Sequence, residues 1–257
     1  MYKRTILIIL VLFSLMSCKD STINSQATIN KPQIDGVLDE WEGILFSTKG
    51  QKFGFGVMND DSTLHIALTT YDKQTIMQVL RGLTIWIDPN SKKDKSFGIK
   101  YPIEADMTGF MDKSNRDSHQ NEDFEFFITQ RLLQQNSIQI VKDDIPHYSD
   151  IDSGEKGIQA KIFYNNGEMN YELRVPFSEF SSDPSEKISI GFESAQLQRP
   201  NGSSSNSFGK SQGGRGGGMS GSGKGGGQKS GGMQGKMKET PKSVNIWLDI
   251  KLNLEKM

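Results

Sequence analysis

Short runs in which apolar and polar residues alternate constrain most strongly how this chain of 257 residues can fold. A period of two places every second side chain on the same face of a β-strand. In the clearest run, aliphatic residues alternate with polar residues and Trp247: Val244, Ile246, Leu248, Ile250, Leu252 and Leu254. Similar runs occur at 64–70, 83–88, 169–175 and 188–192. The pattern predicts an all-β fold, an antiparallel β-sandwich with one buried aliphatic layer.

Other local signals agree with this fold class. Asn165–Gly167 predicts a hairpin turn between the strand at 169–175 and the strand before it. Only two segments favour short helices, 73–80 and 123–134. The region at 101–121 is polar and lacks a periodic pattern, so we expect a long loop there.

The N-terminal segment has the residue order of a secretory signal. Basic residues precede an apolar run at 6–16, which is about half the length that a membrane-spanning helix needs. The sequence Leu15–Cys18 (LMSC) resembles the lipobox of bacterial lipoproteins, in which the cysteine thiol receives a diacylglyceryl group. The resemblance implies a signal peptide at 1–17, acyl chains on Cys18 and attachment to a membrane of the cell envelope, the outer membrane.

Cys18 is the only cysteine of the chain, and lipidation accounts for a lone thiol in an exported protein. The alternative is an ordinary signal peptide followed by an incidental cysteine. Polar residues at 18–29 predict a tether between the lipid and a single domain at 30–257. The membrane partner is therefore expected to be reached through the N-terminal lipid.

The segment at 201–238 differs in composition from the rest of the chain. It holds more than half of the 27 glycines and no acidic residue. Such a segment cannot bury enough apolar surface to offset its ordering entropy, so we predict a disordered insertion before the last strand. Its lysines and arginine fit either a solvated spacer or a module that docks an envelope partner or an anionic glycolipid.

The motif Ile34–Trp41 (IDGVLDEW) is similar to the opening motif of the family 9 carbohydrate-binding modules and their DOMON-like relatives. Three later segments resemble that family in the same order: Leu64–Leu68, Leu83–Asp88 and Tyr171–Phe177. The resemblance covers 34–196 and the last strand, and some envelope lipoproteins of Bacteroidota also share the glycine-rich insertion. It implies a β-sandwich that binds sugars, in some members with calcium and in distant members with haem. The family's tryptophan pair that clamps a sugar ring cannot be aligned with this sequence.

Two tryptophans point away from the aliphatic layer of their predicted strands. Trp86 lies on the same face of its strand as Asp88. Trp247 on the last strand, and Glu172 and Arg174 on the strand at 169–175, also point away from the aliphatic layer. If these strands are neighbours in one sheet, a sugar ring can stack on the indoles while charged groups bind its hydroxyls. The candidate ligand-binding residues are therefore Trp86, Trp247, Glu172, Arg174 and Asp88. The alternative is that they form ordinary cross-strand pairs.

Trp41, in the turn-rich opening motif, is expected to plug one end of the sandwich with its indole N–H on a backbone carbonyl. Two groups of residues offer oxygen ligands for calcium: Asp60 with Asp61, and the turn that follows Asp88. This signal is weak, because turns use the same residue types for hydrogen bonds. The histidines lack the spacing of zinc ligands. We expect no cofactor.

The sequence has no motif for a catalytic nucleophile or a phosphate-binding loop, so no enzyme class is supported. Its 30 basic and 31 acidic residues do not favour a nucleic-acid partner. The leading hypothesis is a non-catalytic, lipid-anchored module that binds a carbohydrate-like ligand. The alternatives are an interaction module that uses the basic glycine-rich loop and a haem-binding domain with His65 and a methionine as axial ligands.

Overall fold

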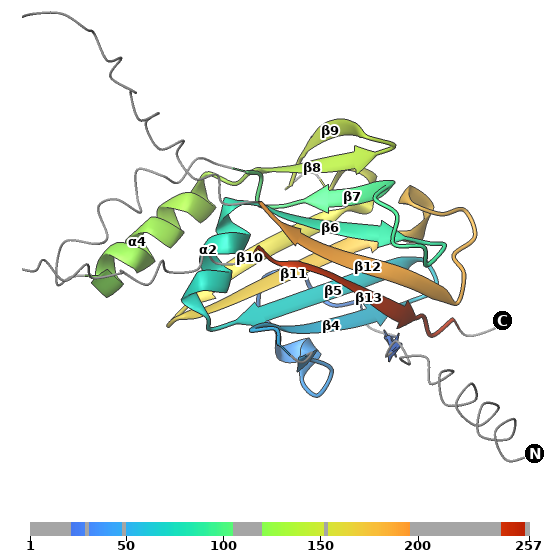
Figure 1. Ribbon diagram of the computed structural model, residues 1–257, viewed down its shortest axis with the longest axis horizontal. Coiled ribbons are helices and arrows are strands. Elements are labelled where there is room, and N and C mark those ends of the chain that lie inside the picture. The colour runs from blue at the N-terminus through green and yellow to red at the C-terminus, as the bar shows by residue number, and fades with distance from the viewer. Residues whose placement is uncertain are drawn as a thin grey trace, which may run out of the picture. The chain divides into compact units, whose positions relative to one another are not determined.

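The computed structural model describes residues 22–28, 31–47, 50–104, 120–151, 154–195 and 243–254. They form two β-sheets that pack face to face (Figure 1). Sheet A has the strand order β1 (Ile23–Asn24), β13 (Asn245–Lys251), β12 (Lys187–Ser194), β6 (Leu83–Asp88), β7 (Phe97–Lys100), β8 (Ser137–Lys142) and β9 (Ile145–Asp150). Sheet B has the order β10 (Gln159–Asn165), β11 (Glu168–Pro176), β5 (Thr63–Thr70), β4 (Gly54–Asn59) and β2 (Gln26–Ala27), with β3 (Phe46–Ser47) also paired to β4. The predicted all-β sandwich is confirmed.

The period of two explains how the sheets pack. Ile66 on β5 and Leu173 on β11 are fully buried, as are Ile85 on β6 and Ile190 on β12. Inward side chains of both sheets belong to one hydrophobic cluster. The five predicted alternating runs coincide with β5, β6, β11, β12 and β13, although β13 ends at Lys251, before the last alternating residues.

Two α-helices, α2 (Lys73–Arg81) and α4 (Gln120–Leu133), coincide with the two predicted helices. The Asp72 carboxylate caps α2 by accepting a hydrogen bond from the Thr75 backbone N–H at 2.9 Å. The described residues also form three 3-10 turns, η1 (Asp39–Trp41), η2 (Glu155–Gly157) and η3 (Phe177–Glu179). Most of the predicted loop at 101–121 lies outside the described residues.

The predicted hairpin turn joins β10 to β11. Asn166 and Gly167 adopt positive φ angles of 51° and 86°, the conformation of a tight type I′ turn that these two residue types favour. The turn sets the register of β11. Leu173 consequently faces the core, and its neighbours Glu172 and Arg174 point away from it.

The sandwich begins earlier in the chain than predicted. β1 pairs with β13 of sheet A, and β2 pairs with β4 of sheet B, both in parallel register. Ser25, between β1 and β2, donates a hydrogen bond to the Asn59 side chain and accepts one from the Asn253 backbone N–H. Residues 22–28 therefore belong to the sandwich, whereas we expected a tether over 18–29.

Three predicted features lie outside the described residues: the signal peptide at 1–17, Cys18 and the insertion at 201–238. The strands that flank the insertion are described. The Ser194 backbone N–H donates to the Val244 carbonyl oxygen at 2.9 Å, so β12 and β13 remain paired up to the point where the chain leaves and returns. Among the described helices, none has the length and apolar character needed to cross a membrane.

Candidate ligand-binding face

A row of alternating tryptophan and glycine residues crosses the outer face of sheet A. In register, Trp247 on β13 pairs with Gly191 on β12, and Gly191 pairs with Trp86 on β6. Trp86 in turn pairs with Gly98 on β7. We call these four residues the tryptophan–glycine row. The structure thus brings Trp86 and Trp247 onto one face of sheet A. Alternation predicted that both point outward, and the pairing of β6, β12 and β13 puts them in the same sheet.

The two indole rings lie flat over the glycines. A methyl group added to Gly98 would lie 2.6 Å from Cε3 of Trp86, and one added to Gly191 would lie 2.8 Å from Cε2 of Trp247. Both distances are far below a normal contact between carbon atoms, so only glycine leaves room for the rings. Both tryptophan side chains remain partly exposed. Each ring therefore turns one apolar face toward solvent.

Glu193, beside this row on β12, holds Trp86 in place. Its Oε2 accepts a hydrogen bond from the Trp86 indole N–H at 2.7 Å, and Lys95 Nζ lies 2.7 Å from the same oxygen. Burial opposes ionisation of Glu193, but the hydrogen bonds from Lys95 and Trp86 outweigh it and lower the pKa of the carboxyl. Lys95 Nζ also lies 5.7 Å from the centroid of the Trp86 ring, in cation–π range. The indole N–H is thus used within the protein, and the part of the ring face that Lys95 leaves uncovered is what remains for a ligand.

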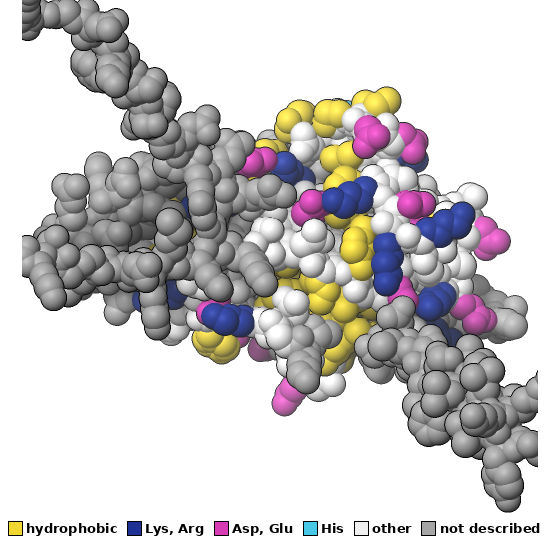
Figure 2. All heavy atoms as spheres, viewed as in Figure 1, with side chains coloured by type: hydrophobic (Ala, Val, Ile, Leu, Met, Phe, Trp, Pro, Cys, Tyr) yellow, Lys and Arg dark blue, Asp and Glu magenta, His cyan; other side chains and the backbone are white. Residues whose placement is uncertain are grey.

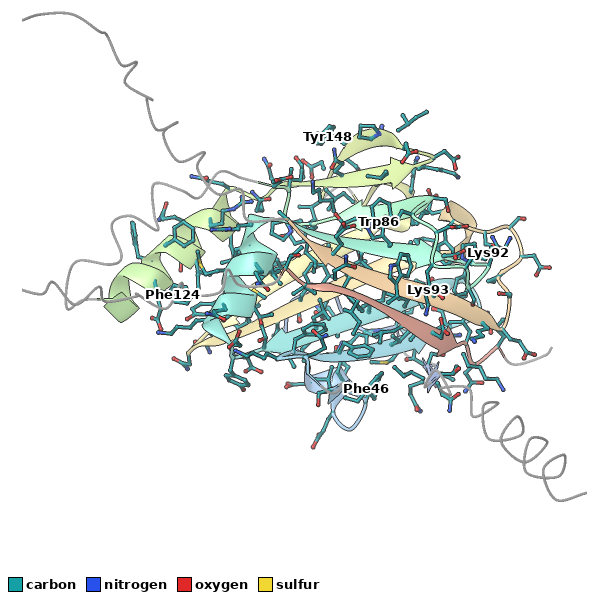
Figure 3. All side chains as sticks on the ribbon, viewed as in Figure 1. Phe46, Trp86, Lys92, Lys93, Phe124 and Tyr148 are labelled. Carbon is teal, nitrogen blue, oxygen red and sulfur yellow. The ribbon has the colours of Figure 1, made fainter. Side chains whose placement is uncertain are left out.

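A second carboxylate, Asp249, lies on the same face two residues after Trp247. It accepts a hydrogen bond from the Ser189 hydroxyl at 2.7 Å, and Lys187 Nζ lies 3.5 Å from it. Burial raises the pKa of Asp249, but Ser189, Lys93 and Lys187 together lower it below its ordinary value. Figure 2 shows dark-blue lysine or arginine side chains beside yellow apolar ones on this face, and Figure 3 labels Trp86 and Lys93 over sheet A.

The structure separates the other predicted ligand residues from the two tryptophans. Glu172 and Arg174 lie on β11 in sheet B, whereas Trp86 and Trp247 lie in sheet A. All four side chains point away from the core, so the two pairs lie on opposite sides of the sandwich and the predicted single face does not form. Alternation assigns a side chain to one face of its strand but does not say which sheet the strand joins.

Glu172 is fully buried and takes part in a structural cluster instead. Its carboxylate accepts hydrogen bonds from the Trp41 indole N–H at 2.9 Å, the Gly36 backbone N–H at 2.7 Å and the Asp35 backbone N–H at 3.1 Å. Burial raises the pKa of Glu172 against these three hydrogen bonds. This Glu172 cluster fastens the opening motif onto the outer face of sheet B.

The Glu172 cluster explains the residue types of the opening motif. Gly36 has a φ angle of +88°, and a Cβ there would lie 2.4 Å from Cβ of Phe163, so glycine is required. Trp41 is fully buried and covers Gly56 of β4, whose added Cβ would lie 2.9 Å from the indole. Trp41 is a buried structural residue, as predicted. Its predicted carbonyl partner is wrong, because its N–H donates to Glu172, and it covers a sheet face, not one end of the sandwich.

Asp88 shares the face of Trp86, but its carboxylate closes a turn. It accepts hydrogen bonds from the backbone N–H groups of Asn90 at 2.8 Å, Lys92 at 2.6 Å and Asp94 at 3.1 Å. The residue is only 1% exposed. The Asp88 carboxylate is therefore engaged in the turn, the commoner role of such residues, and the structure does not turn it toward the two indoles as a ligand contact. In the described part of the chain, no three His, Cys, Asp or Glu side chains are grouped to hold a metal ion.

Arg174 and His65 are cross-strand partners on the outer side of sheet B. Arg174 donates to the Gln159 side chain at 3.2 Å, and His65 is fully buried. The nearest carboxylate oxygen, Oδ2 of Asp60, lies 4.0 Å from His65 Nε2. Burial lowers the pKa of His65 to about 4, so the ring is neutral at neutral pH. A haem could reach His65 only if the chain that covers it moved away.

Four residues that shape the outer face of sheet A were not among the predicted ligand residues: Lys95, Gly98, Gly191 and Glu193. The alternating pattern of its strand predicts that Gly191 lies on the outward face. The sequence does not predict the register that places a glycine beneath each indole, because this register depends on which strands pair.

No protein-family model matches the chain, and no curated protein matches its sequence. Among solved structures, the chain is similar to a family 9 carbohydrate-binding module from Caldicellulosiruptor kristjanssonii in complex with glucose. The identity is 14% and the TM-score 0.33, over 68% of this chain and 78% of that chain. It is also similar to a family 9 module from the same organism in complex with cellotriose, with 13% identity and a TM-score of 0.34, over 68% of this chain and 76% of that chain.

Proposed function

We propose that this protein is a non-catalytic binding protein of the cell envelope that holds a carbohydrate on the outer face of sheet A. The observation that carries the proposal is the pair of partly exposed indoles, Trp86 and Trp247, lying flat on glycines in one cross-strand row. The C–H groups on one side of a pyranose ring form an apolar patch that stacks on such a ring face.

Polar side chains beside the rings supply partners for sugar hydroxyls. Glu193 and Lys95 lie next to Trp86, and Asp249 and Lys187 lie on the other side of the row. Charged donors and acceptors form the stronger hydrogen bonds, and a few of them beside an apolar surface orient a ligand. The face therefore combines the two kinds of contact that a sugar needs.

A lipid on Cys18 would hold this sandwich close to a membrane. β1 begins at Ile23, so the chain between the lipid and the first strand spans at most about 17 Å. Acyl chains contribute about 0.8 kcal/mol per buried CH2 group, and several chains on one residue give a stable attachment. Together with the lipobox resemblance of the sequence, this short distance supports the proposal that the protein is attached to the outer membrane.

Glycan-array binding of the unlipidated chain tests the sugar proposal. Trp86→Ala and Trp247→Ala are each expected to weaken binding by about 1 to 3 kcal/mol, as truncation of a binding hot spot does. Phe126→Ala is the matched control, because it removes an aromatic side chain that is 68% exposed on α4. The proposal fails if no glycan is bound, or if both tryptophan variants bind as well as the control.

A further inference from the structure

We propose that the tryptophan–glycine row binds the interior of an extended glycan chain laid across the strands, with alternate sugars on Trp247 and Trp86. The inference rests on the proposed function and adds how the ligand lies and which part of it is recognised. Three features of the face support it: the spacing of the indoles, the apolar strip that continues past them and, among the described residues, the absence of a facing ring.

The spacing of the indoles matches alternate sugars of an extended chain. Trp247 and Trp86 are separated by β12, and neighbouring strands lie about 4.8 Å apart, so equivalent atoms lie about 9.6 Å apart. Both rings lean in the same direction, onto Gly191 and Gly98, which preserves this separation. In an extended chain of equatorially linked pyranoses, each sugar advances by close to one strand spacing. Sugars two positions apart present the same face and therefore match the two indoles.

The row is apolar along its length. The rings of Trp247 and Trp86 cover Gly191 and Gly98, which have no side chains of their own, and the row continues in register to Val141 on β8 and Pro146 on β9. Val141 is partly exposed and Pro146 is exposed. The apolar strip thus crosses six strands of sheet A, which is longer than one sugar ring and suits a chain.

Polar pairs border both long sides of this strip. Glu193 with Lys95 lies on one side of Gly191, and Asp249 with Lys187 lies on the other. An extended sugar chain has apolar ring faces and carries its hydroxyls along its edges. Both edges of a chain on the row would therefore meet charged hydrogen-bonding groups.

The described residues provide no second ring to clamp a terminal sugar. Ring pairs in this part of the chain are formed by phenylalanine and tyrosine, and neither Trp86 nor Trp247 has a ring facing it. A site for a chain end needs a wall that excludes the next sugar. The row ends at β9, an edge strand, so a chain can continue past it.

Calorimetric titration with β-1,4-linked oligomers of glucose, xylose and N-acetylglucosamine, from monomer to hexamer, tests the inference. In the series that binds, affinity should rise about tenfold or more between monomer and tetramer and then level off. A hexamer whose reducing end has been reduced to the alditol should bind equally well. A monomer that binds as tightly as the hexamer, or loss of binding on reduction of the end, would overturn interior binding. Absence of binding in every series, with an array that is also blank, would refute the proposed function itself.

Two variants on β12 and β13 test the row directly. Trp247→Ala should lower hexamer affinity about tenfold and remove the gain between dimer and tetramer. Gly191→Ala keeps both indoles but displaces Trp247, and we expect the same loss. Gly54→Ala on β4 is the matched control, because its added Cβ would lie 3.2 Å from a methyl group of Thr69 and far from the row. A folded Gly191→Ala protein with unchanged chain-length dependence would contradict the inference.

Discussion

Two carboxylates accept hydrogen bonds from indole N–H groups in this protein, and burial gives them different roles. Glu172 is fully buried with Trp41, whereas Glu193 is partly exposed and holds Trp86 at the surface. A buried donor that loses its acceptor stays unpaired, while water replaces a lost acceptor at the surface. The first pair therefore stabilises the fold, and the second holds a ring at the surface, where the proposed ligand would bind.

Glu172→Ala is expected to lower the free energy of unfolding by about 3 kcal/mol, because the buried N–H donors of Gly36 and Trp41 and the part-buried N–H of Asp35 lose their acceptor. Glu193→Ala is the matched variant. Its side chain is 31% exposed, so the expected loss is below about 1 kcal/mol. Urea unfolding measures both values. Equal losses for the two variants would contradict the structural role of the Glu172 cluster.

His65 is expected to make the folded state less stable as the pH falls from 6.5 to about 4. Burial lowers the pKa of His65 from 6.5 to about 4, against the charge of Asp60, and Arg174 and Lys31 add to the lowering. Within this window the unfolded chain binds a proton that the folded chain does not. The free energy of unfolding should therefore rise with pH, by up to about 1.4 kcal/mol per pH unit.

His65→Gln isolates this contribution from the carboxylates that also titrate at low pH. Urea unfolding across the same pH range should give a flatter dependence for the variant than for the unchanged protein. A variant with an equally steep dependence would show that other groups cause it.

Trp86→Ala and Trp247→Ala are expected to cost less stability than Ile250→Ala. Ile250 is fully buried, and truncation of such a side chain leaves a cavity that costs about 2 to 5 kcal/mol. The two indoles lie on the outside of the sheet and leave no internal cavity. Thermal unfolding measures the stability of the three variants. Equal losses of stability would show that the two indoles are packed as tightly as core residues.

At the scale of elements, alternation predicted β5, β6, β11, β12 and β13 but not β8, although Ile138 and Ile140 alternate with partly exposed residues there. It missed β4, whose residues are buried on both faces because the opening motif covers its outer side. β1 and β2 have only two residues each, too few to show a pattern. The same alternation that identifies the core residues also predicted that Trp86 and Trp247 point away from the core. It could not predict which sheet contains Glu172, because that depends on which strands pair over long sequence separations.

Deletion of 201–238, with the gap closed by a short turn, is expected to leave the fold intact and the unfolding midpoint unchanged or slightly higher. β12 and β13 are already paired where the insertion leaves and returns, and a shorter loop costs less closure entropy. Cooperative thermal unfolding tests this. A midpoint lower by several degrees would show that the insertion stabilises the sandwich.

At the scale of the whole molecule, three parts of the chain would have separate roles in the proposed function. Sheet B carries the opening motif on its outer side through the Glu172 cluster, and sheet A presents the tryptophan–glycine row. A lipid on Cys18 would supply the anchor. β1 and β2 tie the N-terminal chain to both sheets. A lipid at Cys18 would therefore attach the membrane directly to the folded domain.

Cys18→Ala is expected to release the protein from membranes, because the proposed attachment is the lipid alone. Fractionation after a high-salt wash measures it. A variant that stays with the membranes would contradict the lipid anchor.

The indole N–H signals in a two-dimensional 1H–15N NMR spectrum report directly whether a sugar binds on the outer face of sheet A. The chain has three tryptophans, and single Trp→Phe variants assign their signals. When a hexasaccharide selected on the array is added, the signals of Trp86 and Trp247 should shift while that of buried Trp41 stays in place. A bound hexasaccharide that leaves Trp86 and Trp247 unchanged would show that sugars bind elsewhere, and the outer face of sheet A would lose its proposed function.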